Sequence, residues 1–306
     1  MAVTEFSIIS RYFSSLGRGE AIDLGVGDDC AILHLANDQR LATSMDTLVA
    51  GVHFPDDAFP EDIGYRAVAV AASDLAAMGA SPLGITVALT LPEADEFWLT
   101  TFSEGVARAV SEYSLPLVGG DTTKGPLTIT VQVLGSLPSK LALLRSGAAV
   151  GDKLYVSGTL GDAAGGLAFI QEKWQPEPDH ADYVINRFYR PTARLQLGQA
   201  LLGQATSAID ISDGLLADAG HIAAASGVRL NIQSACLPLS EALKSHPNQN
   251  QARQWALCGG DDYELCFTLP ANLPAPEGCT YIGDVTAGEG IDCDLAVDTT
   301  SGYRHF

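Results

Sequence analysis

The spacing of apolar residues predicts strands and helices that alternate along the whole chain. In the first half, strands are expected over 40–50, 82–91, 115–118 and 127–133, with helices over 62–78 and 94–112. In the second half, strands are expected over 153–157, 207–211, 228–233, 262–269 and 280–285. Helices are expected after the glycine-rich stretch 158–166, over 181–202, from 214 to about 227, and over 239–257. Turn-forming residues fill 135–151, so the pattern predicts two related α/β (α+β) domains, at 1–137 and 148–306.

The apolar face of the predicted helix over 62–78 is interrupted by an acid. Steps of three and four residues place the following positions on one face: Ile63, Ala67, Val70, Ala71, Asp74 and Met78. Burying the Asp74 carboxylate is costly unless it is paired or binds a metal ion. Asp74 is therefore a candidate ligand, and capping of a neighbouring element is the alternative.

Asp74 belongs to a set of short motifs that place aspartate beside glycine, serine or threonine. The motifs cover 25–31, 44–47, 73–79, 119–123, 209–214 and 259–264. Two unit charges 4 Å apart repel by about 4 kcal/mol at an effective dielectric constant near 20. Several of these carboxylates could share one site only with cations among them, and hard oxygen ligands favour Mg²⁺.

Each motif taken alone also has an ordinary structural explanation. Asp46 can cap the end of its strand, and Ser212 or Asp213 can cap the helix that follows. The same turn combines two acids, Asp210 and Asp213, with a helix N-terminus that attracts anions. The glycines that precede Asp121 permit close approach of the backbone to a phosphate.

Three further features leave a functional and a structural interpretation open. The stretch 158–166 could cradle phosphate or permit tight strand–helix packing, which we favour slightly; it lacks the Lys-Ser/Thr of a Walker A loop. Arg145 could grip a phosphate or form a surface salt bridge. His53, near glycines and Phe54, could touch an aromatic ligand or be a packed, hydrogen-bonded residue.

Composition excludes several classes of partner. The formal net charge is −20, from 37 acids and 17 bases, so duplex DNA and anionic membranes are not expected partners. The six cysteines include no Cys-x-x-Cys pair, which favours reduced, mostly buried thiols in a cytoplasmic protein. The sequence shows neither a signal peptide pattern nor an uninterrupted apolar run of about 18 residues, so we expect no membrane span.

The six ordered motifs together resemble those of the thiamine-monophosphate kinase family. That family belongs to a superfamily with aminoimidazole-ribonucleotide synthetase and selenophosphate synthetase, and the resemblance runs from Glu5 to Tyr303. It implies a two-domain aminoimidazole-ribonucleotide synthetase-like fold and a homodimer whose N-terminal domains pair into a barrel-like sheet. It also implies ATP-dependent phosphorylation of thiamine monophosphate to thiamine diphosphate.

Site residues follow from the motifs that match. The resemblance implies metal ligation by Asp29, Ser44, Met45, Asp46, Asp74, Asp121, Asp210 and Asp213. It implies ATP contacts from Gly120, Asp121, Arg145 and Ser212, and substrate contacts from His53, Asp261 and Tyr303. No catalytic base is expected, because a phosphate monoester is already mostly ionised at neutral pH.

Two positions depart from the family pattern. Met45 replaces a small hydroxyl residue, so a metal contact there would use the backbone carbonyl. Asp261 stands where glutamate is common, which shortens the reach to substrate by one methylene. The rival functions are another ATP-using reaction of the superfamily and a non-catalytic metal- or nucleotide-binding maturation factor.

Overall fold

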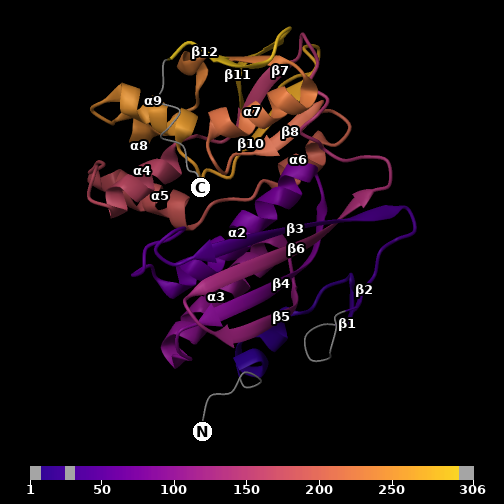
Figure 1. The fold of residues 1–306 in the computed structure, drawn as a ribbon, viewed down its shortest axis with the longest axis vertical. Coiled ribbons are helices and arrows are strands. Elements are labelled where there is room, and N and C mark those ends of the chain that lie inside the picture. Colours follow the sequence, from indigo (N-terminus) through magenta and orange to yellow (C-terminus); the bar gives the residue numbers. More distant parts are fainter. Residues whose placement is uncertain (1–7, 25–31, 296–306) are drawn as a thin grey trace. The chain divides into compact units, whose positions relative to one another are not determined.

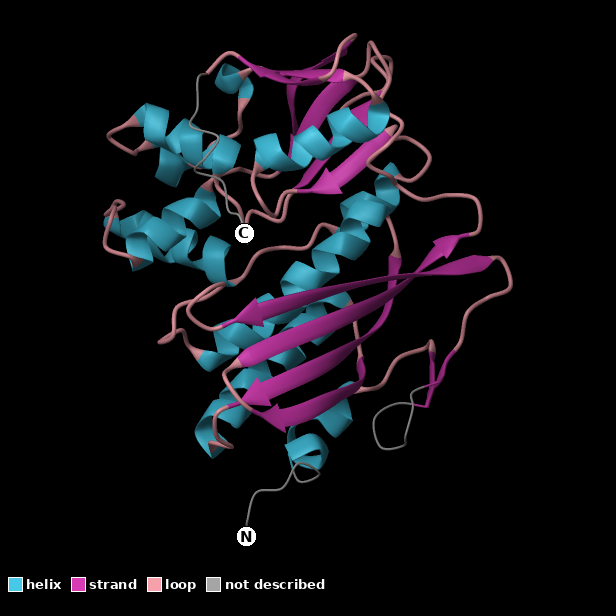
Figure 2. Ribbon diagram, viewed as in Figure 1, coloured by secondary structure: helices cyan, strands magenta, loops and turns pink. Residues whose placement is uncertain are grey.

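The computed structural model describes residues 8–24 and 32–295, which form two compact units. Of the described residues, the first unit comprises those up to 75 and 80–141, and the second comprises 76–79 and 142–295. Helices and strands alternate in both units (Figures 1 and 2). No helix in these described ranges is both long and apolar enough to cross a membrane.

The first unit is built on a four-stranded sheet with the order β3-β6-β4-β5. Its strands are β3 (Gln39–Val49), β4 (Ser81–Leu91), β5 (Leu117–Lys124) and β6 (Thr128–Pro138). β4 and β5 run parallel, whereas the other neighbours are antiparallel. Two helical turns, η1 (Ile9–Phe13) and η2 (Ser14–Leu16), and the small antiparallel pair β1 (Ile22–Leu24) and β2 (Ile32–Leu33) precede this sheet.

Helices α2 (Pro60–Met78) and α3 (Glu96–Tyr113) lie on one face of this sheet (Figure 2). The two helices touch through glycines. A Cβ on Gly64 would lie 2.3 Å from the carbonyl oxygen of Phe102, and one on Gly105 would lie 1.9 Å from that of Glu61. Backbone contact at this distance leaves no room for any side chain, so the pair fixes how α2 crosses α3.

The second unit contains a six-stranded, mostly antiparallel sheet with the order β12-β9-β11-β7-β10-β8. Its strands are β7 (Lys153–Ser157), β8 (Ser207–Asp210), β9 (Arg229–Ile232), β10 (Leu265–Leu269), β11 (Cys279–Thr286) and β12 (Gly290–Cys293). Its helices are α4 (Asp162–Ile170), α5 (Pro178–Tyr189), α6 (Leu195–Leu201), α7 (Leu215–Ser226), α8 (Glu241–Lys244) and α9 (Gln249–Cys258), with the short turn η3 (Ser234–Cys236).

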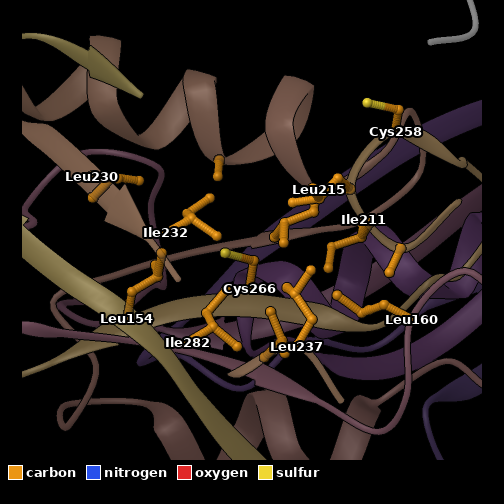
Figure 3. Close-up of a cluster of buried hydrophobic side chains, with 14 of the residues drawn as sticks. Leu154, Leu160, Ile211, Leu215, Leu230, Ile232, Leu237, Cys258, Cys266 and Ile282 are labelled. Carbon is orange, nitrogen blue, oxygen red and sulfur yellow. The ribbon is translucent and has the colours of Figure 1, made fainter. Parts of the chain in front are cut away.

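The core of the second unit lies between this sheet and α7. Leu154, Leu230, Ile282 and Cys266 come from four different strands, and Leu215 comes from the first turn of α7 (Figure 3). All five side chains are fully buried. Burial raises the pKa of the Cys266 thiol, because the thiolate is poorly solvated there. Of the five described cysteines, all are free and only Cys258 and Cys266 are buried, so the expectation of mostly buried thiols is wrong.

Several predicted boundaries are wrong for identifiable reasons. The helix predicted over 181–202 is two helices, α5 and α6, because Pro191 disfavours helical geometry at the residue before it. Pro247 divides the predicted helix over 239–257 into α8 and α9 in the same way. The strand predicted over 115–118 continues through Asp121 to Lys124, because its parallel pairing with β4 continues.

Candidate active site

Strand β3 and helix α2 bring two of the predicted ligands together in the first unit. Ser44 and Asp46 alternate with Met45 along β3, so they lie on the half-buried face of the strand, whereas the Met45 side chain is 60% exposed on the other face. The Ser44 hydroxyl donates a hydrogen bond to Oδ2 of Asp74 at 2.5 Å. Residues 30 positions apart thus form one polar contact beside the buried stripe of α2.

Asp74 and Asp46 are both partly withdrawn from water. Asp74 is half-buried between Ser73 and Leu75, which are fully buried, and one carboxylate oxygen of Asp46 is buried. Desolvated carboxylate oxygens beside a hydroxyl are hard donors, which is the kind of ligand that Mg²⁺ takes. The donor chemistry on this face therefore fits the implied metal. Within residues 8–24 and 32–295, however, no group of three or more His, Cys, Asp or Glu side chains is close enough to hold an ion.

The loop after β3 holds His53 by its ring. The backbone N–H of Val49 donates to Nδ1 of His53 at 3.0 Å, and the N–H of His53 donates to the carbonyl of Val49 at 3.0 Å. An imidazole that accepts a hydrogen bond at Nδ1 carries its ring proton on Nε2. His53 is thus hydrogen-bonded within its loop, as one of the two interpretations of the sequence expected, and its ring donor is Nε2.

Gly120 and Asp121 lie within β5, where the glycine has a packing role. A Cβ on Gly120 would lie 2.1 Å from the carbonyl oxygen of Val87 in β4. Only glycine permits this approach of the two parallel strands, so the glycine does not by itself indicate a phosphate contact. Asp121 is exposed.

In the second unit, the two acidic turns at 209–214 and 259–264 lie side by side. Their backbones continue the β8–β10 pairing: Ile211 N–H donates to the Glu264 carbonyl, and Tyr263 N–H to the Ile211 carbonyl, each at 2.8 Å. The N–H of Asp261 then donates to the carbonyl of Ser212, also at 2.8 Å. The structure therefore brings together Ser212 and Asp261, which are 49 positions apart in the sequence.

A strand was predicted over 262–269, but residues 262–264 belong to the turn at 259–264 instead. Asp261 and Tyr263 have φ values of 68° and 51°, in the left-handed region that non-glycine residues rarely adopt. Strand β10 consequently begins at Leu265. The Tyr263 hydroxyl donates to Oδ1 of Asp261 at 3.2 Å, so both left-handed residues belong to one half-exposed surface.

A buried ionic network supports this turn from beneath. Glu264 is fully buried and accepts from Nε and Nη2 of Arg194 at 2.6 and 2.5 Å and from Nη2 of Arg187 at 3.0 Å. The Ser157 hydroxyl adds a fourth bond to the same carboxylate at 2.5 Å. Two guanidinium groups thus compensate an acid that could not otherwise be buried.

The neighbouring acid, Asp262, explains the glycine-rich stretch. It is fully buried and accepts from the N–H groups of Gly161 at 2.7 Å and Ala163 at 3.4 Å, at the start of α4. Burial raises the pKa of Asp262, whereas Arg187 lowers it. A Cβ on Gly166 would lie 2.1 Å from the carbonyl oxygen of Val184. These amides and Gly166 therefore serve internal contacts, although Gly166 packs α4 against helix α5 rather than against a strand.

The amides at the start of α7 are also engaged within the chain. The N–H groups of Ser212, Asp213 and Gly214 all donate to Oδ2 of Asp218, at 3.0, 3.0 and 3.1 Å. Asp218 is 3% exposed; burial raises its pKa to about 7, although the amide bonds oppose that shift. A carboxylate of the chain therefore occupies these three turn amides, whereas the anion site expected at the helix N-terminus stays a prediction.

The remaining predicted residues are placed as follows. Asp210 ends β8 and is buried, whereas Asp213 is half-exposed beside it in the turn. Arg145 is exposed, and its backbone carbonyl accepts a hydrogen bond from the Ser226 hydroxyl at 3.2 Å. Asp29 and Tyr303 lie outside the described residues. Sequence reasoning missed Asp218, although an acid in the first turn of the helix after 209–214 was a usable signal.

Comparison with known proteins places this architecture. A model of the AIR synthase related protein N-terminal domain matches residues 27–137. Escherichia coli HypE, a hydrogenase maturation protein, superposes with a TM-score of 0.73 at 21% identity over 95% of this chain and 94% of that one, a likeness of fold alone. The chain thus has the mixed helix–strand fold of the AIR synthase-related class.

Relatives at higher identity narrow the class. The thiamine-monophosphate kinase of Escherichia coli (strain K12) is 48% identical over 100% of this chain and 99% of its own length. The crystal structure of thiamine-monophosphate kinase from Stenotrophomonas maltophilia K279a superposes with a TM-score of 0.86 at 42% identity, covering 96% of this chain and 98% of that one. The structure of AaThiL complexed with AMPPCP and TMP gives 0.82 at 35% identity, covering 100% and 99%. The chain belongs to the thiamine-monophosphate kinase family.

Proposed function

We propose that this chain, a phosphotransferase by its family, transfers the γ-phosphoryl group of ATP to thiamine monophosphate and forms thiamine diphosphate. The end-to-end match to thiamine-monophosphate kinases, at 48% identity, carries the proposal. AaThiL, which covers the same length, was solved with AMPPCP and TMP. AMPPCP is an ATP analogue, and in this family TMP denotes thiamine monophosphate, so the two ligands represent the two substrates.

The transfer is direct and requires no base from the protein. The acceptor phosphate has its second pKa near 6, so its oxygen is already mostly ionised at neutral pH. The barrier is then repulsion between two anions and the cost of aligning them. Bound magnesium ions would offset that repulsion and hold both phosphates in line. The chain contributes oxygen ligands and fixed donors.

We assign the metal ligands by the motifs that match the family. They are Asp29, Ser44, Asp46, Asp74, Asp121, Asp210 and Asp213, with the backbone carbonyl of Met45. The hydrogen bond between Ser44 and Asp74 supports this set, because it holds two of the donors together on the half-buried face of β3. Gly120, Asp121, Arg145 and Ser212 are proposed to contact ATP.

His53, Asp261 and Tyr303 are proposed to contact thiamine monophosphate. The Nδ1 contact of His53 supports a specific role, because it leaves Nε2 as the donor of the ring. Tyr263 supports Asp261 through its hydroxyl. A carboxylate held in this way would pair well with the positive charge of the thiazolium ring.

The wider assignments follow the same family. We propose a cytoplasmic homodimer in which residues 1–137 bind ATP and Mg²⁺ and pair through their sheets, while residues 148–306 form an α+β domain. Exposed Leu41 and Met45, on the outer face of β3, support pairing through that face. Sedimentation velocity tests it: Leu41→Glu should shift a dimer towards monomer, and an unchanged dimer would place the interface elsewhere.

The function is tested by incubating the protein with ATP, Mg²⁺ and thiamine monophosphate, beside parallel reactions with thiamine and with the acceptors of related superfamily enzymes. We expect thiamine diphosphate and ADP in equal amounts from the monophosphate alone. ATP consumption with another acceptor, or tight nucleotide binding without any transfer, would overturn the proposal. A phosphoprotein trapped from γ-labelled ATP would refute direct transfer.

A further inference from the structure

We propose that Asp218 is a positioning residue that fixes the turn carrying Ser212 and Asp213 before nucleotide and metal arrive. The inference rests on the proposed function for what the turn binds. Its structural basis is independent: one buried carboxylate oxygen accepts three consecutive backbone N–H groups.

The three bonds to Asp218 determine which groups of the turn face the interior and which face the surface. Ile211 and Gly214 are buried at its two ends, whereas Ser212 and Asp213 between them are half-exposed. The backbone of Ser212 is held on both sides, since its N–H bonds Asp218 and its carbonyl bonds the N–H of Asp261. With the amides drawn inward, the Ser212 hydroxyl and the Asp213 carboxylate are the polar side chains that this turn presents.

The bonding of Asp218 to these amides has a further consequence. Consecutive amides in a turn before a helix can bind an anion, and here the amides of Ser212, Asp213 and Gly214 already bond an internal acid. The turn consequently presents oxygen ligands for a cation, while its three backbone amides are not available to bind an anion. Mutating groups that hydrogen-bond a metal ligand and orient it typically costs about 10–100-fold in metal affinity or activity, and we take this range as the scale for Asp218.

The test compares Asp218→Asn with Asp152→Asn. Asp152 is a suitable control because it is also buried, accepts a backbone N–H from Ala149 at 2.9 Å, and lies outside the proposed site. Both variants keep the side-chain volume and replace a carboxyl group by an amide. Binding of Mn²⁺ in the presence of AMPPCP is measured by electron paramagnetic resonance at a temperature where circular dichroism shows both variants folded, and kcat and KM for ATP are measured alongside.

We expect Asp218→Asn to weaken Mn²⁺–nucleotide binding and raise the KM for ATP by about tenfold or more, and Asp152→Asn to leave both within about twofold. Equal values for the two variants would overturn the proposal. If Asp218→Asn does not fold, hydrogen exchange is measured on the wild-type protein without metal. We expect the amides of Ser212, Asp213 and Gly214 to be protected from exchange. Rapid, unprotected exchange of these amides would overturn the proposal. Because binding is measured without turnover, this result is independent of which acceptor is phosphorylated.

Discussion

The buried network around Glu264 provides a stability test whose size follows from the contacts. The substitution Glu264→Gln replaces the carboxylate by an amide, whose NH₂ group must face at least one guanidinium donor. Four hydrogen bonds converge on this carboxylate, three from Arg187 and Arg194 and one from Ser157. The side chains of the two arginines are 11% and 32% exposed, so they gain little from water when the negative charge is removed.

Breaking one side of a buried ion pair costs about 3–5 kcal/mol. Because Arg194 is partly exposed, we expect the lower end of that range, about 3 kcal/mol. Urea unfolding followed by tryptophan fluorescence measures it, since Trp174 and Trp255 contact each other in the second unit, with ring centroids 5.3 Å apart. Glu241→Gln is the control, because the Glu241 side chain is 79% exposed in its pair with Lys244 and should change stability by under about 0.5 kcal/mol. A loss below about 1 kcal/mol for Glu264→Gln would show that the arginines do not depend on this acid.

Three further substitutions test other parts of the molecule. Asp74→Asn keeps an acceptor for the Ser44 hydroxyl, so unfolding free energy should change by under about 1 kcal/mol while kcat/KM falls about 100-fold or more; equal losses would mark Asp74 as structural. Gly166→Ala should cost about 1–3 kcal/mol in urea unfolding because its Cβ meets a backbone oxygen at 2.1 Å, whereas Gly220→Ala, with nothing within 4 Å, should stabilise α7 by up to about 1 kcal/mol; similar effects would refute this packing. The hydrogen bond from Lys153 lowers the pKa of Asp284, so its contribution exists above pH 4 and is lost as pH falls further. The melting-temperature difference between wild type and Asp284→Asn should therefore be small at pH 6 and shrink as pH falls below 4, and a difference that grows on acidification would contradict this sign.

Local sequence patterns predicted the elements whose geometry is set locally. Helix α2 follows from its apolar stripe, and the interruption of that stripe at Asp74 correctly indicated a polar contact, here with Ser44. The breaks at Pro191 and Pro247 were also available in the sequence, because proline restricts the residue before it. Those two errors came from giving apolar periodicity more weight than proline.

Elements fixed by distant partners could not be found in the same way. Strand β12 is four residues long and forms only by pairing in parallel with β9, some 60 positions earlier. The extension of β5 through Asp121 likewise depends on β4. Since the stability of a strand comes largely from its neighbours, a short or glycine-rich strand gives a weak local signal.

The acidic motifs show most clearly what the sequence alone does not predict, because adjacent aspartates in one motif have opposite orientations. In Asp261-Asp262 the first carboxylate is half-exposed and the second is fully buried on the amides that begin α4. Asp261 and Tyr263 have left-handed backbone geometry, whereas the side chains of Asp262 and Glu264 between and after them are buried. Non-glycine residues keep left-handed geometry only where surrounding contacts compensate its cost of about 1–3 kcal/mol for each residue. Counting acids therefore identifies the turns that carry the chemistry. It does not identify which acid is buried to support a turn and which acid is exposed at its surface. That difference depends on arginine side chains and backbone amides from other parts of the fold.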